Sequence, residues 1–235
     1  MNLMILEQKD FIADDMIELS GRRLKHMLEI QKVVVGSSIK AGLINGKVGT
    51  AIVTDIRSKT IILQVRLTEQ PPAPLPKTLI IALPRPKMLR RIIQTVATLG
   101  IKDLYLINTW KVEKSYWLTP KLCETNIREQ LILGLEQGCD TILPKVILKK
   151  CFKPFLEDEL TAIVKDSSAL VAHPNKNKSD GIKTKKNIVL AVGPEGGFTE
   201  YEVKKFIEIG FQPISLGQRI QRVETVVPFL LGKLS

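Results

Sequence analysis

Near the C-terminal end, an apolar segment leads directly into a glycine-rich loop and then into the start of a helix. Residues 187–192 have the apolar pattern of a buried strand, and residues 193–197 read Gly-Pro-Glu-Gly-Gly. Thr199 and Glu202 follow with the spacing of a capping box, which predicts that a helix begins at once. Glycines in front of a helix N-terminus leave backbone N–H groups open to a ligand. This order of elements predicts a ligand-binding loop at the end of a strand.

A second unit of the same design follows a short distance along the chain. It consists of a strand at 213–216, a turn at Gly217 and a helix at 222–231. Ligands of open α/β sheets bind beyond the carboxyl ends of the strands. We therefore expect the two loops to form two walls of one pocket.

The first loop does not match the known phosphate-binding patterns. It lacks a terminal Gly-Lys-Ser/Thr, and no Gly-x-Gly-x-x-Gly follows any strand. Glu195 stands among the glycines, where its carboxylate would repel a phosphate. A neutral or cationic ligand suits this loop better, and an ordinary glycine-rich turn is the structural alternative.

Positive charge is concentrated in the second part of the chain. The 235 residues carry a net charge of +11, of which +2 falls in residues 1–75 and +9 in residues 76–235. Such an excess indicates a polyanionic partner, RNA or DNA, without choosing between them.

Composition disfavours several classes of protein. The three cysteines lack C-x-x-C spacing and the two histidines, His26 and His173, lie far apart, so neither a disulfide framework nor a metal site is expected. No apolar run approaches the roughly 18–20 residues of a membrane span, and the first residues turn acidic too early for a signal peptide. We expect a soluble cytoplasmic protein that uses no metal and does not associate with membranes.

A proline-rich linker at 71–76 divides the chain into two predicted domains, because such a segment continues neither a helix nor a central strand. Residues 1–70 combine a short helix with several strands, which suits a small β-barrel of the kind used by RNA-binding accessory domains. Asn45-Gly46 is a strong hairpin signal between two of the strands. The elements expected here are a helix capped by Ser20 and strands at 38–44, 47–56 and 61–67.

Residues 77–235 alternate between strands and helices, the pattern of an α/β fold with a mostly parallel sheet and helices on both faces. An apolar stripe from Leu89 to Val96 marks a helix that Gly100 ends. The other elements expected before the two loops are strands at 78–83, 103–108, 145–148 and 169–172 and a helix at 127–137.

The chain resembles the bacterial 16S ribosomal RNA uridine-N3 methyltransferases, a family of SPOUT-type methyltransferases. Two motifs carry the resemblance: Gly-Pro-Glu-Gly-Gly-Phe at 193–198 and Leu-Gly-x-Arg-Ile-x-Arg-x-Glu-Thr at 216–225. Ala172-His173-Pro174 also looks like the family's first donor-contacting loop. The match covers nearly the whole chain in order, and motifs of this length at this separation are highly specific.

The resemblance implies S-adenosylmethionine as the methyl donor and N3 of a specific uridine in 16S ribosomal RNA of the small ribosomal subunit as the acceptor. It further implies a PUA-like RNA-binding β-barrel over residues 1–70, a SPOUT-type methyltransferase domain over residues 77–235, and a homodimer. The second domain would contain a C-terminal trefoil knot, which no periodicity argument predicts because chains rarely thread loops.

We expect Arg222 and Glu224 to be catalytic, with Arg222 stabilising the uracil oxyanion, and we assign no general base. The structural alternatives are a salt bridge between Glu224 and Arg222, and a helix cap at Thr225. The residues expected to bind the donor are His173, Gly193, Pro194, Glu195, Gly196, Gly197, Leu216, Gly217, Ile220, Arg222 and Thr225. Those expected to contact RNA phosphates are Arg22, Arg23, Lys25, Arg85, Lys87, Arg90 and Arg91.

The chain departs from the family's pattern chiefly where RNA is expected to bind. Residues 1–6 contain no arginine, and the usual Leu-Pro-Lys-Gly-Asp reads Leu-Pro-Arg-Pro-Lys at 83–87. Asp140 stands where an arginine is common, and in the second motif Gln221 and Val226 replace a leucine and an alanine. The donor-binding motifs are thus retained while several RNA-facing positions differ.

Two other functions stay open. One is a SPOUT-type ribose 2′-O-methyltransferase acting on tRNA, which nucleoside analysis separates because the methyl group would lie on the sugar. The other is a non-catalytic RNA-binding or ribosome-assembly factor, which calorimetry separates because a vestigial pocket should bind no donor.

Overall fold

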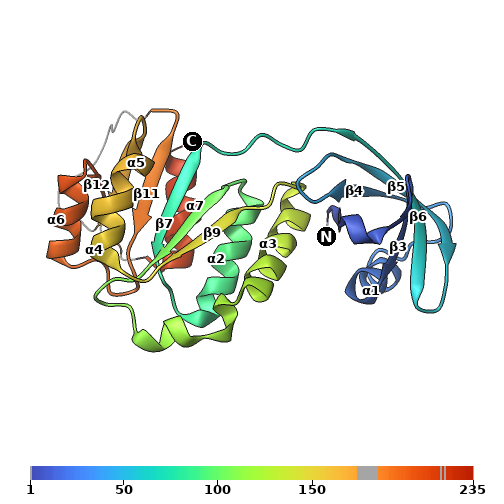
Figure 1. Cartoon of the computed structure of the whole chain (residues 1–235), viewed down its shortest axis with the longest axis horizontal. Helices are drawn as coiled ribbons and strands as arrows, with labels where there is room; N and C mark the ends of the chain where they lie inside the picture. Colours follow the sequence, from blue (N-terminus) through green and yellow to red (C-terminus); the bar gives the residue numbers. More distant parts are fainter. Residues whose placement is uncertain (1, 174–184, 218, 220, 235) are drawn as a thin grey trace. The chain divides into compact units, whose positions relative to one another are not determined.

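The computed structural model describes residues 2–173, 185–217, 219 and 221–234 of the chain (Figure 1). The chain forms two compact units. Residues 1–73 and 132–143 form the N-terminal unit, and residues 74–131 and 144–235 form the C-terminal unit. Each unit has a sheet of its own, and the prediction of an α/β class with a largely parallel second sheet is confirmed.

The N-terminal unit is built on a six-stranded sheet with the order β1-β4-β5-β6-β3-β2. β1 pairs with β4 in parallel, and the other neighbours are antiparallel. The three strands predicted for this part are confirmed as β4, β5 and β6, whereas β1, β2 and β3 were not predicted. The strands are β1 (Met4–Leu6), β2 (Phe11–Ala13), β3 (Met16–Ser20), β4 (Ser38–Leu43), β5 (Val48–Ile56) and β6 (Thr60–Glu69), and a short 3-10 helix, η1, covers Gln8–Asp10.

Local signals in the N-terminal unit are confirmed with one correction. Asn45 takes a positive φ of 57°, and the N–H of Gly46 donates to the carbonyl of Leu43 at 2.8 Å, as the hairpin prediction requires. The predicted helix is α1 (Gly21–Glu29), and Ser20 is its N-cap residue. The Ser20 side chain makes no capping hydrogen bond, however, and Ser20 is also the last residue of β3.

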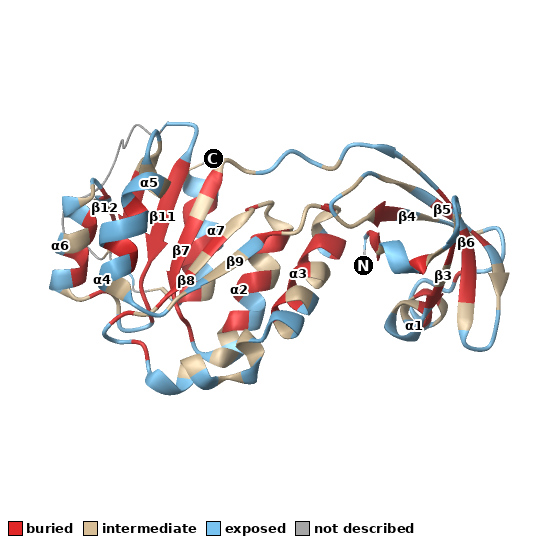
Figure 2. Ribbon diagram, viewed as in Figure 1, coloured by how far each residue is buried: buried red, intermediate tan, exposed pale blue. Residues whose placement is uncertain are grey.

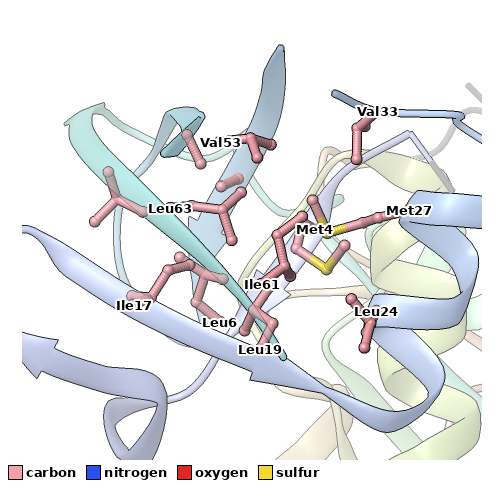
Figure 3. Packing of buried hydrophobic residues seen from close by; sticks show 13 residues of the cluster. Met4, Leu6, Ile17, Leu19, Leu24, Met27, Val33, Val53, Ile61 and Leu63 are labelled. Carbon is pink, nitrogen blue, oxygen red and sulfur yellow. The ribbon is translucent and has the colours of Figure 1, made fainter. Parts of the chain in front are cut away.

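The core of the N-terminal unit lies between helix α1 and the sheet. Figure 3 shows Leu24 and Met27 of α1 facing the aliphatic side chains of β1, β3 and β6, among them Leu6 and Leu63. Ile61, Leu63 and Val65 of β6 belong to this core, and their burial stabilises the unit. Burial lowers the pKa of His26, also on α1, below its ordinary value.

The end of helix α3 (Glu124–Gly138) and the residues after it belong to the N-terminal unit. The N–H groups of Asn2 and Leu3 both donate to the carbonyl of Glu136 at 3.0 Å, and the N–H of Asn45 donates to that of Thr141 at 2.9 Å. Glu136, whose side chain is only 3% exposed, forms a bidentate ion pair with Arg22 of α1. These bonds fasten the 132–143 segment to the sheet.

The C-terminal unit is built on a six-stranded sheet with the order β12-β10-β11-β7-β8-β9, in which every neighbouring pair is parallel. Residues of β7, β8 and β11 are largely buried, as Figure 2 shows in red, and such near-continuous burial is typical of parallel strands. The strands are β7 (Lys77–Ala82), β8 (Asp103–Ile107), β9 (Lys145–Lys149), β10 (Ser168–Ala172), β11 (Ile188–Val192) and β12 (Gln212–Ile214).

The predicted helices of the C-terminal unit are confirmed, and a further helical stretch was missed. Gly100, with a φ of +77°, follows α2 as predicted, and α3 begins one turn before its predicted start. The missed stretch packs against β11 through α5 and contains a π-helical turn, η4. The further elements are α2 (Pro86–Thr98), η2 (Lys114–Leu118), η3 (Pro120–Leu122), α4 (Phe152–Pro154), η4 (Phe155–Leu160), α5 (Thr161–Val164), α6 (Glu200–Glu208) and α7 (Val223–Lys233).

Helix α7 is fastened to the sheet at its C-terminal end by a buried lysine. Lys77, at the start of β7, donates from its Nζ atom to the carbonyls of Leu231 and Leu234 at 3.4 and 3.0 Å. Burial lowers the pKa of Lys77, and the carbonyls at this helix end favour its charged form. The contact holds α7 against the strand next to β11.

We predict that Leu63→Ala lowers the free energy of unfolding by about 2–5 kcal/mol, because Leu63 is fully buried and its removal leaves a cavity. Urea denaturation followed by circular dichroism measures the change. Ile52→Ala, at a neighbouring position that is 47% exposed, is the control and should cost about 0.5 kcal/mol. Equal losses for the two variants would contradict this account of the core.

Candidate functional site

Three neighbouring parallel strands of the C-terminal unit end at the same edge of the sheet. β10 lies between β12 and β11, and each of the three is followed by a loop that carries predicted site residues. His173 follows β10, Gly193 follows β11, and Gly217 lies shortly after β12. Because the sheet order brings these strands together, the loops after them converge.

The three loops line one pocket of about 200 Å³, here called the loop pocket. Both glycine-containing loops take part in it, as expected, and the loop after β10 and the first turns of α7 complete it. The lining residues are Ala172, His173, Val192, Gly193, Pro194, Glu195, Gly196, Gly197, Ile214, Leu216, Gly217, Arg219, Gln221, Val223 and Val226.

The glycines of the loop pocket are required by its geometry. A Cβ atom at Gly193 would lie 2.8 Å from the backbone nitrogen of Phe198, closer than packed atoms approach, so this turn closes only with glycine. Gly217 has a φ of +99°, a conformation that L side chains rarely adopt, and a Cβ there would meet no other atom. Each of the two loops therefore requires glycine at this position.

Phe198 and a capping box fix the glycine loop to helix α6. Phe198 is 4% exposed, and its ring centroid lies 5.1 Å from that of Phe206 on α6. The predicted capping box is confirmed: the Thr199 N–H donates to the Glu202 carboxylate at 2.7 Å, and the Glu202 N–H donates to the Thr199 hydroxyl at 3.2 Å. The loop between β11 and α6 is therefore anchored at the end next to the helix.

The carboxylate of Glu202 also holds a second loop. It accepts a hydrogen bond from the backbone N–H of Trp110, in the segment after β8, at 2.7 Å. The neighbouring Lys111 donates from Nζ to the carbonyl of Gly196 at 2.7 Å. Two bonds therefore connect the 108–112 segment to the glycine loop and its helix.

The loop pocket combines an apolar lining with a few polar groups that lack protein partners. Among the described residues, Nδ1 of His173 and Oε1 of Gln221 are buried atoms without a hydrogen-bond partner. Buried polar atoms are costly when unpaired, so a ligand that supplies partners would gain binding free energy here. The lining also includes the aliphatic residues Ala172, Val192, Ile214, Leu216, Val223 and Val226.

Glu195 places a carboxylate at the edge of the loop pocket. Its side chain is 35% exposed, and its Oε1 atom lies 3.8 Å from Nε of Arg85. The same atom accepts a hydrogen bond of 3.3 Å from the backbone N–H of Arg85. The ion pair is partly open to water and contributes little to stability. The carboxylate is accordingly available to a cationic or hydroxyl-bearing ligand.

The structure brings most of the predicted donor-binding residues together. Eight of them line the loop pocket: His173, Gly193–Gly197, Leu216 and Gly217. Ile220 lies outside the described residues. Arg222 is the exposed N-cap residue of α7, and Thr225 lies within the helix, which rules out the alternative that Thr225 is its cap. Glu224 is half-buried in the first turn.

Sequence reasoning missed several lining residues of the loop pocket, above all Gln221 and Arg219. Both lie inside the second motif, so the motif itself was the available signal. Val226 lines the pocket one turn into α7 from Val223, a helical spacing that marks a shared face.

The residues predicted to contact RNA have different surroundings. Arg23 forms a bidentate ion pair with Asp10, which is 5% exposed, and Arg22 pairs with Glu136. The Nε of Arg90 donates to Gln130 at 3.4 Å. The remaining four, Lys25, Arg85, Lys87 and Arg91, are exposed.

In the described part of the chain, no helix is both long and apolar enough to cross a membrane. Nor does any group of three or more His, Cys, Asp or Glu side chains come together there in a way that could hold a metal ion.

The family model and the relatives that match this chain are all RNA methyltransferases. The model of a family described as an RNA methyltransferase domain matches residues 71–235. A ribosomal RNA small subunit methyltransferase E from Treponema pallidum is 31% identical over 232 residues, which cover 96% of this chain and 87% of the relative. Ribosomal RNA small subunit methyltransferase E 1 from Borreliella burgdorferi is 30% identical over 226 residues, covering 96% and 93%.

Solved structures share the fold over the full length. A ribosomal RNA small subunit methyltransferase E from Neisseria gonorrhoeae, described as bound to S-adenosylmethionine, superposes with a TM-score of 0.74 at 22% identity and covers 100% of this chain and 96% of that one. A methyltransferase from Legionella pneumophila, described as a complex with the same cofactor, gives 0.73 at 19% identity over 99% and 96%. At these identities the likeness is one of fold.

We predict that Glu202→Gln speeds hydrogen exchange at the backbone amides of Thr199 and Trp110, because an amide group replaces the carboxylate that accepts from both. Exchange measured by mass spectrometry or NMR tests this. Glu200→Gln, an exposed residue of the same helix turn, is the matched control and should leave both amides unchanged. Unchanged protection in the Glu202 variant would show that the carboxylate does not hold the two loops.

Proposed function

Because this chain belongs to the RNA methyltransferase family that includes ribosomal RNA small subunit methyltransferase E, we propose that it transfers a methyl group from S-adenosylmethionine to 16S ribosomal RNA. We propose N3 of a specific uridine as the acceptor atom. The loop pocket is the observation that carries the proposal, because it gathers both motifs at the ends of three parallel strands.

The lining of the loop pocket fits such a donor. Its aliphatic residues suit the flat apolar faces of an adenine ring. The buried Gln221 Oε1 atom is an acceptor suited to an amino or hydroxyl group, and His173 Nδ1 offers a further polar contact. Glu195 is suited to a positively charged amino group.

When bound, the donor supplies a methyl group activated by its sulfonium sulfur. The protein's part is to hold the acceptor base in line with that group, and most of the rate enhancement comes from this positioning. The uridine base must be unpaired to expose N3, and it must lose the N3 proton on the way to the transition state. We propose that the Arg222 guanidinium stabilises the negative charge that develops on the uracil oxygens.

Arg222 is suitably located for this role. It is exposed at the N-terminus of α7, immediately after Gln221 and before Val223, both of which line the loop pocket. The positive end of the helix dipole adds to its field. We propose Glu224, half-buried in the first turn of α7, as a second catalytic group, and we assign no general base.

We further propose that residues 1–70 form a PUA-like RNA-binding domain and that residues 77–235 form the SPOUT-type catalytic domain. The exposed Lys25 in the first and Lys87 and Arg91 in the second are the proposed phosphate contacts. We also propose a C-terminal trefoil knot, which rests on the motifs at 193–198 and 216–225 alone, because the order β12-β10-β11 also occurs in unknotted doubly wound sheets. We propose a homodimer as the working form.

The experiment that tests the function uses the purified protein, S-adenosylmethionine labelled in its methyl group, and small ribosomal subunits that lack uridine-N3 methylation. We expect label in 16S ribosomal RNA, and nucleoside analysis should identify 3-methyluridine. Label on a ribose would favour the 2′-O-methyltransferase alternative, and no label in any RNA would contradict an enzyme.

We predict that Arg222→Ala leaves the donor's dissociation constant nearly unchanged and lowers the rate of methyl transfer by a factor of about 100–1,000, the effect of losing one oxyanion-stabilising group. Calorimetry and single-turnover transfer measure the two quantities. An equal loss of donor binding and transfer would assign Arg222 to donor binding or folding. Arg57→Ala, an exposed arginine of the N-terminal unit, is the control.

We predict that Gly193→Ala abolishes measurable donor binding, because its Cβ atom and the Phe198 backbone cannot both occupy the present turn. Gly232→Ala is the control, since a Cβ at this position of α7 meets no atom within 4 Å. Circular dichroism verifies that both variants are folded. Donor binding by a folded Gly193→Ala protein would contradict the role given to this loop.

A further inference from the structure

We infer that a second pocket, built around Trp110, binds an unpaired nucleobase of the RNA strand that flanks the methylated nucleotide. The inference rests on the proposed function in so far as RNA is the substrate. It deepens that proposal by assigning a substrate contact to the segment after β8, to which neither motif belongs.

The second pocket, here called the tryptophan pocket, lies wholly within the C-terminal unit. Its lining includes Trp110 and Trp117, the only two tryptophans of the chain, with Tyr201 from the first turn of α6. Two lysines, Lys114 and Lys150, lie on the same lining, and both are exposed. Aromatic faces beside ammonium groups are the combination that single-stranded nucleic acids require.

Trp110 is an aromatic side chain that is exposed on a fixed backbone. Trp110 is 86% exposed, while its backbone N–H donates to the buried carboxylate of Glu202 at 2.7 Å. The adjacent Lys111 is bonded to the Gly196 carbonyl, which holds the backbone from the other side. A large apolar surface presented to water on a fixed backbone is typical of a binding site, because little conformational freedom is lost when a ligand covers it.

A buried polar atom in the same pocket lacks a partner. Thr109 is 5% exposed, and among the described residues its hydroxyl oxygen has no hydrogen-bond partner. A hydroxyl can donate to and accept from the polar edge of any base, and leaving it unpaired is costly. The neighbouring Asn108 accepts a hydrogen bond from Nε1 of Trp117 at 2.9 Å, which fixes the orientation of the second indole.

Charge favours a nucleic acid strand as the occupant over an apolar segment of protein. The one carboxylate among the described lining residues, Glu202, is 3% exposed and accepts hydrogen bonds from Thr199 and Trp110. Lys114 and Lys150 are the exposed charged residues of the lining, and they suit the phosphates on either side of a stacked base. The pocket thus offers a stacking face, a polar atom for the base edge and cations for the backbone.

The tryptophan pocket borders the loop pocket but shares no lining residue with it. The bonds from Trp110 to Glu202 and from Lys111 to Gly196 join the two across the glycine loop. A base held here would thus belong to a nucleotide near the methylated uridine, because the glycine loop that lines the loop pocket is bonded to the segment that carries Trp110. Stacking a neighbour helps to keep the target strand unpaired.

The direct test is the fluorescence of Trp110 in a full-length Trp117→Phe protein, where it is the sole tryptophan. A short single-stranded RNA oligonucleotide of mixed sequence is the probe, and the same backbone with abasic sites is its control. We expect the oligonucleotide to quench the indole emission and the abasic strand to leave it unchanged. Absence of quenching, or equal quenching by both strands, would overturn the inference.

Affinity measurements with the otherwise unaltered protein provide the second test. Trp110→Ala should weaken binding of the oligonucleotide about tenfold, the loss of one base–aromatic stack, and Trp110→Phe should recover most of it. Leu118→Ala is the matched control, because Leu118 is 84% exposed in the same segment but does not line the pocket. Unchanged affinity in Trp110→Ala would overturn the inference.

Donor binding separates a failure of this inference from a failure of the proposed function. Calorimetry with S-adenosylmethionine should give the same dissociation constant for Trp110→Ala and the unaltered protein. If the unaltered protein binds no donor, the proposed function fails. If donor binding and methyl transfer persist while Trp110→Ala binds RNA normally, only the tryptophan pocket is refuted. A fall in molecular mass of Trp110→Ala by light scattering, with RNA affinity retained, would instead identify this surface as a subunit contact.

Discussion

The buried carboxylate of Glu202 is the interaction on which the arrangement of the candidate site depends. It lies at the N-terminus of α6, where free backbone N–H groups and the helix dipole favour a negative charge. Its oxygens accept from the N–H of Thr199, which ends the glycine loop after β11, and from that of Trp110, in the loop after β8, two strands away on the sheet. One side chain thus fixes both the wall of the loop pocket and the backbone of the tryptophan pocket.

Much of this arrangement was predictable because it is local in sequence. The Thr199–Glu202 spacing predicted the capping box, and Asn45-Gly46 predicted the hairpin between β4 and β5. Burial on both faces made β11 and the last four residues of β7 apolar, which marked them as strands. By contrast, β1 and β2 were missed because strands of three residues are too short to display an alternating pattern.

Other features depend on contacts between residues that are far apart in the chain, and the sequence pattern does not predict such contacts. The three loops meet because β12 pairs with β10 rather than with β11. The residues of the strands do not indicate which partner each strand takes. The bond between Lys111 and Gly196 joins residues 85 positions apart. The ion pairs of Arg22 with Glu136 and of Arg23 with Asp10 are further contacts of this kind, and whether these two arginines also contact RNA stays a prediction.

The central claim is that the loops after β10, β11 and β12 bind the methyl donor. A crystal structure with S-adenosylhomocysteine tests this claim most directly. The account predicts electron density for the ligand between residues 193–197 and 215–217, with the buried polar atoms of His173 and Gln221 near its polar groups. Density for the compound at any other place, with these loops unchanged, would contradict it.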